Sequence, residues 1–187
     1  MGSYVVDVQK DSTASVEAIW RFLADVTTWT EWSSFDEASY AREGEPPPHG
    51  VGAERALRVG PFRSVDTVHS FDPPTRLAYG YSGPIPMKNY RAEVTLTPRG
   101  TGTRIRWKAQ FSPTIPLTGR LIQALLAKLF RDLSAGLARA AESAVPSGSA
   151  GVIDKSAARR SRDQVDVARD RIPATVGRRR RSMRPAS

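Results

Sequence analysis

Apolar and polar residues recur with two different periods along the chain. Residues 4–9 alternate loosely, as the residues of a strand do. Ser15 can then cap a helix whose apolar face is supplied by residues 19–23. A short second turn of helix, or a tight loop, holds Trp29 and Trp32, which lie three residues apart and would share one side of such a turn. These two side chains would either plug one end of a core or contact a ligand.

Between residues 40 and 111 the period is two, and Gly and Pro turns separate the alternating runs. Two runs joined by the turn at residues 98–102 predict a β-hairpin with one buried face and one wet face. An earlier run, at residues 77–81, alternates in the same way. The inward positions of these runs would be Leu77, Tyr79, Tyr81, Tyr90, Ala92, Val94, Leu96, Ile105, Trp107, Ala109 and Phe111.

The run at residues 62–71 is irregular because its large side chains change parity. Phe62 and Val68 share one face of a regular strand, whereas Val65 and Phe71 share the other. A β-bulge inserts one extra residue and moves the following side chains to the opposite face. We therefore expect a bulge within this run.

After Pro116 the period becomes helical, and it stays so until about residue 143. The apolar positions are Ile122, Leu125, Leu126, Leu129, Phe130, Leu133, Gly136, Leu137 and Ala140. One long amphipathic helix therefore follows the strands, and curling the sheet around this helix would bury both apolar surfaces. The expected fold class is α+β, in the order strand, two short helical pieces, about six strands and a long helix.

Charge divides the 187 residues into two parts. The formal net charge is +9, and residues 146–187 carry +7 of it, with eleven basic side chains against four acidic ones. This segment contains no aromatic residue, so it cannot bury enough apolar surface to offset its chain entropy. We expect one domain at residues 1–145 and a disordered basic tail at residues 146–187. The arginines at 178–181 would contact nucleic acid or an anionic surface weakly, or form a solvated extension only.

The absence of cysteine excludes a disulfide scaffold, thiolate zinc sites, iron–sulfur clusters and a cysteine nucleophile. Two histidines, His49 and His69, supply neither a histidine-rich metal site nor a convincing triad. We therefore expect no cofactor and no metal. The chain begins without a recognisable targeting signal, and charged residues interrupt its most apolar helical stretch, so we expect a cytoplasmic protein without a transmembrane segment. Its oligomeric state stays open.

Four segments of the chain resemble one known family. They are "VEAIWRFLADVTTWTEW" (16–32), "FDPPTRLAYGY" (71–81), "YRAEVTLTPRGTGTRIRW" (90–107) and the closing leucine-rich helix. In this order they resemble the polyketide cyclase/dehydrase and lipid-transport family of the START-like SRPBCC superfamily, over residues 3–144. The resemblance implies a helix-grip fold, in which a curved seven-stranded antiparallel sheet wraps the C-terminal helix and leaves a deep cavity. It implies no shared catalytic signature, so no catalytic residue is assigned.

The parity of the strands indicates which side chains would face that cavity. Three tyrosines on inward positions suit a ligand site because their hydroxyls need partners that a dry core seldom provides. The alternative for each position is a filled core. The candidate ligand-binding residues are Arg55, Leu57, Asp66, Tyr79, Tyr81, Tyr90, Trp107, Leu125 and Leu129.

Arg55 carries the sharpest chemical signal of this set. It shares parity with Leu57, so its guanidinium would point inward, where a charge needs a partner such as Asp66 or a ligand carboxylate. Alternatively, Arg55 lies near a strand end and reaches water, or the register is shifted by one residue. His69 is the one plausible base of the domain, but it lies on the face opposite to Asp66 unless the bulge intervenes.

Three functions are compatible with these residues. The first is binding of a hydrophobic or amphipathic small molecule, lipid-like or polyketide-like, between the sheet and the long helix. The second is a polyketide cyclase or dehydratase, in which Arg55 and Tyr79 or Tyr81 would orient a carbonyl and His69 or Asp66 would move protons. The third is an RNA-associated or ribosome-associated interaction protein that uses the arginine-rich tail.

Overall fold

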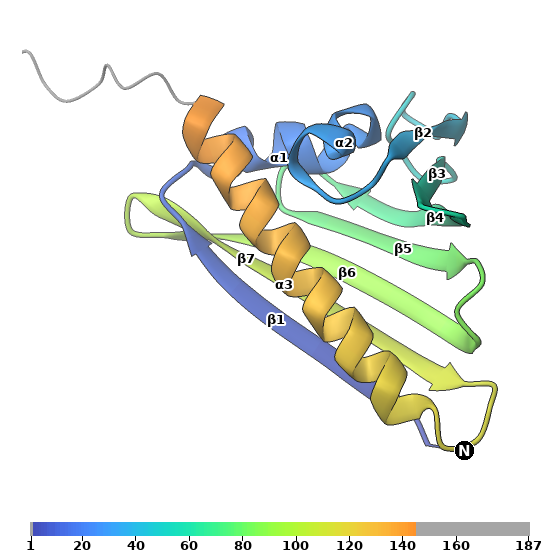
Figure 1. Ribbon diagram of the computed structural model, residues 1–187. Coiled ribbons are helices and arrows are strands. Elements are labelled where there is room, and N and C mark those ends of the chain that lie inside the picture. The colour runs from blue at the N-terminus through green and yellow to red at the C-terminus, as the bar shows by residue number, and fades with distance from the viewer. Residues whose placement is uncertain (1, 145–187) are drawn as a thin grey trace, which may run out of the picture. The chain divides into compact units, whose positions relative to one another are not determined.

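A single antiparallel sheet of seven strands surrounds the long C-terminal helix in the computed structural model, which describes residues 2–144 (Figure 1). The strands are adjacent in the order β1-β7-β6-β5-β4-β3-β2, so β1 closes onto the last strand of a meander. The elements are β1 (Tyr4–Ser12), α1 (Val16–Ala24), η1 (Val26–Thr28), α2 (Trp29–Trp32), β2 (Glu37–Arg42), β3 (Glu54–Val59), β4 (Phe62–Asp72), β5 (Arg76–Ser82), β6 (Met87–Arg99), β7 (Gly102–Pro113) and α3 (Gly119–Ala144). The expected fold class and element order are confirmed.

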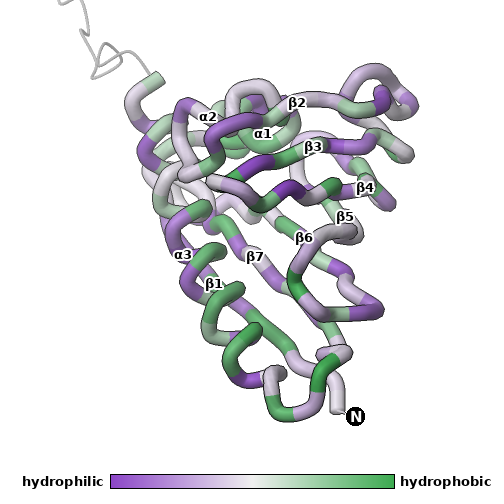
Figure 2. Tube along the Cα trace, turned by 45° about the vertical axis from the view of Figure 1, so that its right-hand side comes forward, coloured by the Kyte–Doolittle hydropathy of each residue, from purple (hydrophilic) through white to green (hydrophobic). Residues whose placement is uncertain are grey.

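The helix α3 crosses the inner face of the sheet, where it packs against β1, β7, α1 and α2 (Figure 1). Its buried residues recur mostly every three or four positions and are largely apolar, and hydrophobic residues return along the helix in the same way (Figure 2). Leu121 and Leu125, in the first two turns, lie beside these buried residues and are 72% and 51% exposed. The second half of the helix is therefore packed more completely than its beginning.

The predicted hairpin is formed by β6 and β7. Val94 pairs with Trp107 and Leu96 pairs with Ile105, and all four side chains are buried. The polar residues between them, such as Arg106, lie on the outer face, where Arg106 binds Asp7 of β1. The alternation of apolar and polar residues thus correctly predicted which side chains of the hairpin are buried and which lie on the outer face.

A β-bulge interrupts β4, as the sequence predicted. The register between β4 and β5 shifts between Val68 and Ser70, so that Val68 and Phe71 both pack toward the core. His69 is the extra residue, and its exposed ring covers Gly80 on the outer face of the sheet. The bulge therefore lies beyond Asp66 and does not bring an Asp66–His69 acid–base pair into the interior.

The predicted basic tail, residues 146–187, and its arginine run at 178–181 lie outside the described residues. Among residues 2–144, no helix is long and apolar enough to cross a membrane.

Gly136 sits where α3 touches the backbone of α2. A Cβ atom at this position would lie 2.0 Å from the carbonyl oxygen of Trp32. We expect Gly136→Ala to lower the free energy of unfolding by about 1–3 kcal/mol, because overpacking outweighs the gain in helix propensity. Urea denaturation followed by circular dichroism measures this effect.

Ala135→Gly is the matched control, since it changes only helix propensity at the neighbouring, partly exposed position and should cost about 1 kcal/mol. A Gly136→Ala variant as stable as the natural chain would contradict the close contact between α3 and α2.

Candidate functional site

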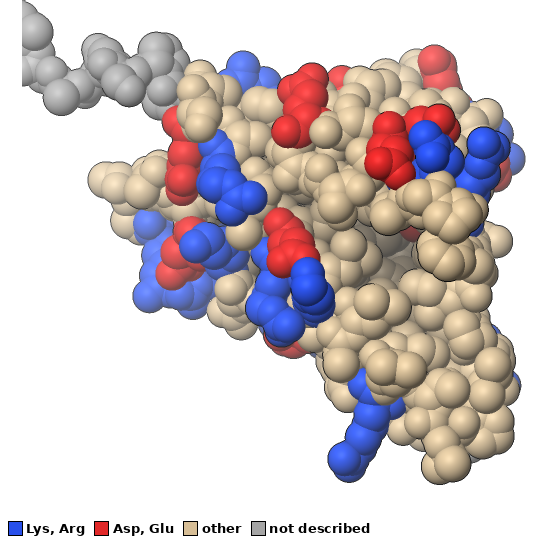
Figure 3. Space-filling model, in the orientation of Figure 1, with Lys and Arg blue, Asp and Glu red and all other residues tan. Residues whose placement is uncertain are grey.

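A cavity of about 560 Å³ lies between the first half of α3 and the inner face of β3, β4, β5 and β6. The surface is hollowed beside α3, and the rim of this hollow is formed largely by uncharged residues (Figure 3). Phe62, at the tip of the β3–β4 hairpin, is 62% exposed and borders the same space as the exposed Leu121 and Leu125. These three side chains mark the mouth of the cavity.

The helix wall of the cavity is wholly apolar. Each residue that α3 contributes to the cavity is a leucine, an isoleucine or a phenylalanine, since the inward side of an amphipathic helix is mainly apolar and its buried Ser134 does not line the cavity. Trp29 of α2 and Phe35 close the end of the cavity that lies nearest the short helices. The α3 residues are Leu121, Ile122, Leu125, Leu126, Leu129, Phe130 and Leu133.

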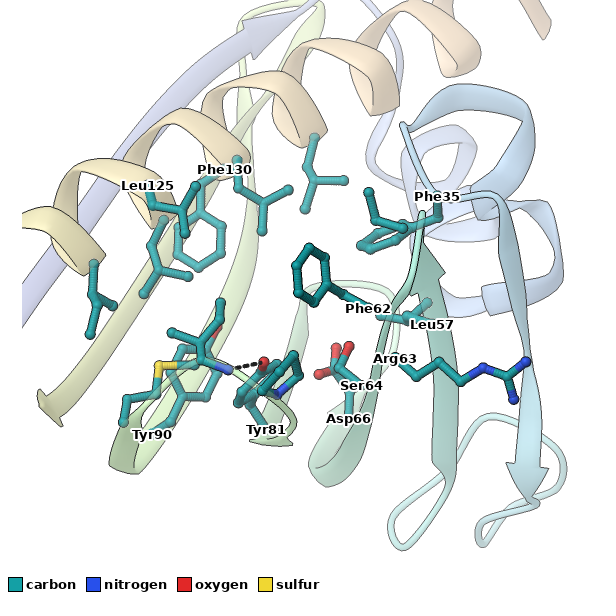
Figure 4. Close-up of a pocket in the computed structure, with 18 of the residues that line it drawn as sticks. Phe35, Leu57, Phe62, Arg63, Ser64, Asp66, Tyr81, Tyr90, Leu125 and Phe130 are labelled. Carbon is teal, nitrogen blue, oxygen red and sulfur yellow. Dashed lines mark hydrogen bonds between the residues drawn. The ribbon is translucent and has the colours of Figure 1, made fainter. Parts of the chain in front are cut away.

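The sheet wall, in contrast, carries polar groups in its middle. Tyr79 of β5 lines the cavity. Asp66 of β4, Tyr81 of β5 and Tyr90 of β6 face it from neighbouring strands (Figure 4). The Tyr79 hydroxyl accepts a hydrogen bond from Trp107 Nε1 at 2.9 Å, and the Tyr81 hydroxyl accepts one from the backbone N–H of Ile85 at 3.2 Å. A phenol that accepts still has its own proton to donate. The sheet wall can therefore donate hydrogen bonds to a guest molecule.

Arg55 lies behind this wall and is 1% exposed. Its guanidinium carbon lies 4.8 Å from the centres of the Trp29 and Tyr79 rings, which therefore enclose the cation. Its Nη2 atom is 3.6 Å from Asp66 Oδ2, while none of its side-chain nitrogens donates a hydrogen bond to another residue of 2–144. Arg55 thus balances the charge of Asp66 without reaching the cavity surface. The expectation that Arg55 points inward toward Asp66 is confirmed, and the alternatives of a water-exposed or register-shifted arginine are wrong.

Burial raises the pKa of Asp66 to about 7, against the lowering effect of the nearby Arg55 charge. Burial also raises the pKa of Tyr79 and of Tyr90, so both phenols keep their protons at neutral pH. Asp66 is therefore the group at the cavity surface that gains or loses a proton near neutral pH. It can act as an acceptor when ionised and as a donor when protonated.

Seven of the nine candidate residues line the cavity, and two lie behind it. Trp107 is fully buried, stacks on Phe130 with ring centres 5.5 Å apart and holds the Tyr79 hydroxyl. Arg55 likewise supports Tyr79 and Asp66 from behind. The lining candidates are Leu57, Asp66, Tyr79, Tyr81, Tyr90, Leu125 and Leu129.

Several lining residues were not found from the sequence. Phe62 and Ser64 share the parity of Asp66, so a firm register for β4 would have identified them. The segment 84–86 reaches the cavity only through tertiary packing, and no pattern in the sequence marks it for this role, whereas ligand contact by Trp29 was one of the two roles expected for it.

Cavity and fold together define a helix-grip protein with an internal apolar pocket. Comparison with known families matches residues 4–144 to "Polyketide cyclase / dehydrase and lipid transport". The chain therefore belongs to this family, as its sequence motifs indicated. A comparison with curated proteins finds no match.

Solved structures of the same fold are similar to the chain at low sequence identity. A START superfamily protein from Mycobacterium smegmatis has a TM-score of 0.65 and 14% identity, with 76% of this chain and 99% of that chain covered. A protein from Thermus thermophilus has a TM-score of 0.62 and 18% identity, with 76% and 99% covered. Truncated norcoclaurine synthase from Thalictrum flavum has a TM-score of 0.59 and 11% identity, with 74% and 92% covered. These matches establish the fold alone.

The raised pKa of Asp66 has a consequence for stability. Because the folded state holds this proton more tightly than the unfolded chain does, acid pH favours folding, and the benefit is lost as pH rises from about 4 to about 7. Asp66→Asn does not titrate. The free energy of unfolding of the natural chain minus that of Asp66→Asn should therefore fall between about pH 5 and about pH 8 in urea denaturation.

Asp72→Asn removes an exposed carboxylate of the same strand, whose pKa is lowered by hydrogen bonds from Ser70 and Arg76. The corresponding difference for this control should stay flat over the same pH interval. A flat or rising difference for Asp66 would show that its carboxyl is not desolvated as the structure indicates.

Proposed function

We propose that this protein binds a hydrophobic or amphipathic small molecule, lipid-like or polyketide-like, in the cavity between α3 and the sheet. The observation that carries the proposal is the cavity itself, with its apolar helix wall and its few polar groups on the sheet wall. Its volume of about 560 Å³ falls within the range of roughly 300–1,000 Å³ that is typical of small-molecule sites. Membership of a family described by lipid transport and polyketide chemistry supports the same ligand class.

Apolar burial supplies the main driving force in this proposal. A ligand that loses roughly 300 Å² of apolar surface to the cavity gains about 7 kcal/mol before the costs of binding are subtracted. The α3 leucines provide this surface, and the hydroxyls of Tyr79 and Tyr81 fix the orientation of a polar end. The exposed apolar mouth at Phe62, Leu121 and Leu125 gives the ligand a route inward.

A second candidate function is catalysis by a cyclase or dehydratase, and Asp66 is the observation that favours it. A carboxyl with a pKa of about 7 at the cavity surface is suited to accept and return a proton. Tyr79 and Tyr81 would hold a substrate carbonyl by hydrogen bonds. A carrier and an enzyme differ in one outcome: a carrier releases its ligand unchanged, whereas an enzyme releases a product of altered mass.

The third candidate, association with RNA or a ribosome, rests on the arginines at 178–181. These residues lie outside the described part of the chain, so this function remains a hypothesis from the sequence.

Filling the cavity tests the proposed function. Leu129→Trp places a larger ring in the cavity wall, so we expect the affinity for the neutral dye Nile red to fall by about 1–3 kcal/mol of binding free energy. A fluorescence titration measures this affinity, because the dye emits strongly only in an apolar environment.

Leu117→Trp is the matched control, since Leu117 is fully exposed and does not line the cavity. This variant should bind Nile red as the natural chain does. Equal binding by the Leu129→Trp variant, or an absence of binding by the natural chain, would refute the proposal.

A further inference from the structure

Resting on the proposed function, we infer that the cavity selects apolar molecules whose polar end is a neutral oxygen group, such as an alcohol, a phenol or a ketone, and that Asp66 excludes those that end in a carboxylate. Of the charge pair formed by Arg55 and Asp66, only the carboxylate lies at the cavity surface. Asp66 thereby has a role in specificity.

The distribution of polar groups fixes the orientation of an amphipathic guest. Asp66 and Tyr81 face the cavity from the sheet, whereas Leu125 and Phe130 face it from the helix (Figure 4). A polar end placed against α3 would be desolvated without a partner, and this is costly. A polar end that enters the cavity must therefore lie at the sheet wall, beside Asp66.

Asp66, and not Arg55, is the charged group that such a polar end meets. Both side chains are buried, at 4% and 1% exposure, but only Asp66 belongs to the cavity lining. Arg55 is enclosed between the Trp29 and Tyr79 rings and holds its charge 3.6 Å from the carboxylate. One cation and one anion thus already balance at this end of the cavity.

The other groups around Asp66 add no charge at neutral pH. Tyr79 and Tyr81 on β5 and Tyr90 on β6 are phenols, and α3 presents only apolar side chains to the cavity. Arg63 of β4 also borders the cavity, but it is exposed and its side chain extends away from Asp66 (Figure 4). Arg55 on β3, whose Nη2 lies 3.6 Å from Asp66 Oδ2, is therefore the cation that balances Asp66.

A neutral oxygen group finds partners at this wall, but a carboxylate does not. A hydroxyl donates to the Asp66 carboxylate and accepts from a tyrosine hydroxyl, and a ketone accepts from Tyr79 or Tyr81. A carboxylate places a second negative charge against Asp66, with one cation for two anions in a desolvated site. It can enter only with a proton shared between the two carboxyl groups, as in paired carboxylates.

The unpartnered donors of Arg55 give the inference a distinctive signature. Asp66→Asn removes the anion and leaves a buried guanidinium whose nitrogens have no acceptor among residues 2–144. A ligand carboxylate then becomes the missing counter-charge. The order of preference between the two end groups should therefore reverse in this variant.

Two probes of equal chain length, 1-decanol and decanoate, test this selectivity by displacement of Nile red at about pH 8. We expect the natural chain to bind 1-decanol at least about tenfold more tightly than decanoate, since a like charge at close range costs more than the free energy of a tenfold ratio. Asp66→Asn should bind decanoate more tightly than 1-decanol. Asp72→Asn, which removes an exposed carboxylate from the same strand, should keep the natural preference.

A measurement on the natural chain makes the test independent of whether Asp66→Asn folds. Calorimetry in two buffers of different ionisation enthalpy counts the protons taken up on binding. Decanoate should bind with uptake of a proton at about pH 8, and 1-decanol should bind with none.

The outcomes separate this inference from the proposed function. If neither probe displaces Nile red, the proposed function and the inference both fail. If both probes bind equally, without proton uptake by decanoate, the inference is wrong and the cavity still binds apolar molecules. A natural preference for decanoate would show that Arg55, and not Asp66, governs the polar end.

Discussion

The site depends on a mismatch between one helix and one sheet. The sheet is wide enough to curl around α3, but α3 packs against β1, β7 and the short helices, and does not descend onto β3, β4 and β5. The leucines in the first half of α3 face inward. The space between α3 and the strands β3, β4 and β5 is therefore apolar on its helix side. Protein interiors are normally close-packed, and a cavity of about 560 Å³ is far larger than ordinary packing defects. A ligand would supply the contacts that the helix does not.

Within that apolar space, one buried charge pair sets the chemistry. Removing two charges from water is expensive, and an arginine that donates no hydrogen bond to another residue of 2–144 is a costly residue to keep in a core. Trp29 and Tyr79 offset part of this cost by enclosing the guanidinium. The arrangement leaves Asp66 at the cavity surface, beside tyrosine hydroxyls that can donate. Shape and apolar contact thus admit a ligand, while the Asp66 carboxyl discriminates between end groups.

Local periodicity was sufficient to predict most of the fold. The hairpin of β6 and β7 and the helix α3 have strong periods, and the parity conflict between Val68 and Phe71 located a bulge correctly. The parity of Arg55 with Leu57 also predicted an inward guanidinium with Asp66 or a ligand carboxylate as its partner, and in the structure Arg55 and Asp66 pair directly across β3 and β4. Parity alone, however, cannot tell a residue that lines a cavity from one that stands behind it. Trp107 and Arg55 are buried beneath the surface that Tyr79 forms, and Trp29 reaches the cavity from a different helix.

A methyl NMR titration of the protein with 1-decanol tests directly whether the cavity beneath α3 binds apolar molecules. Binding there should shift the signals of Leu126, Leu129 and Leu133, saturating at one molecule per chain, while Val5 and Val51, which are exposed and outside the cavity, stay unchanged. Shifts confined to exposed methyl groups, or shifts that never saturate, would contradict this binding. Such a result would mean that the space beneath α3 is not a binding site.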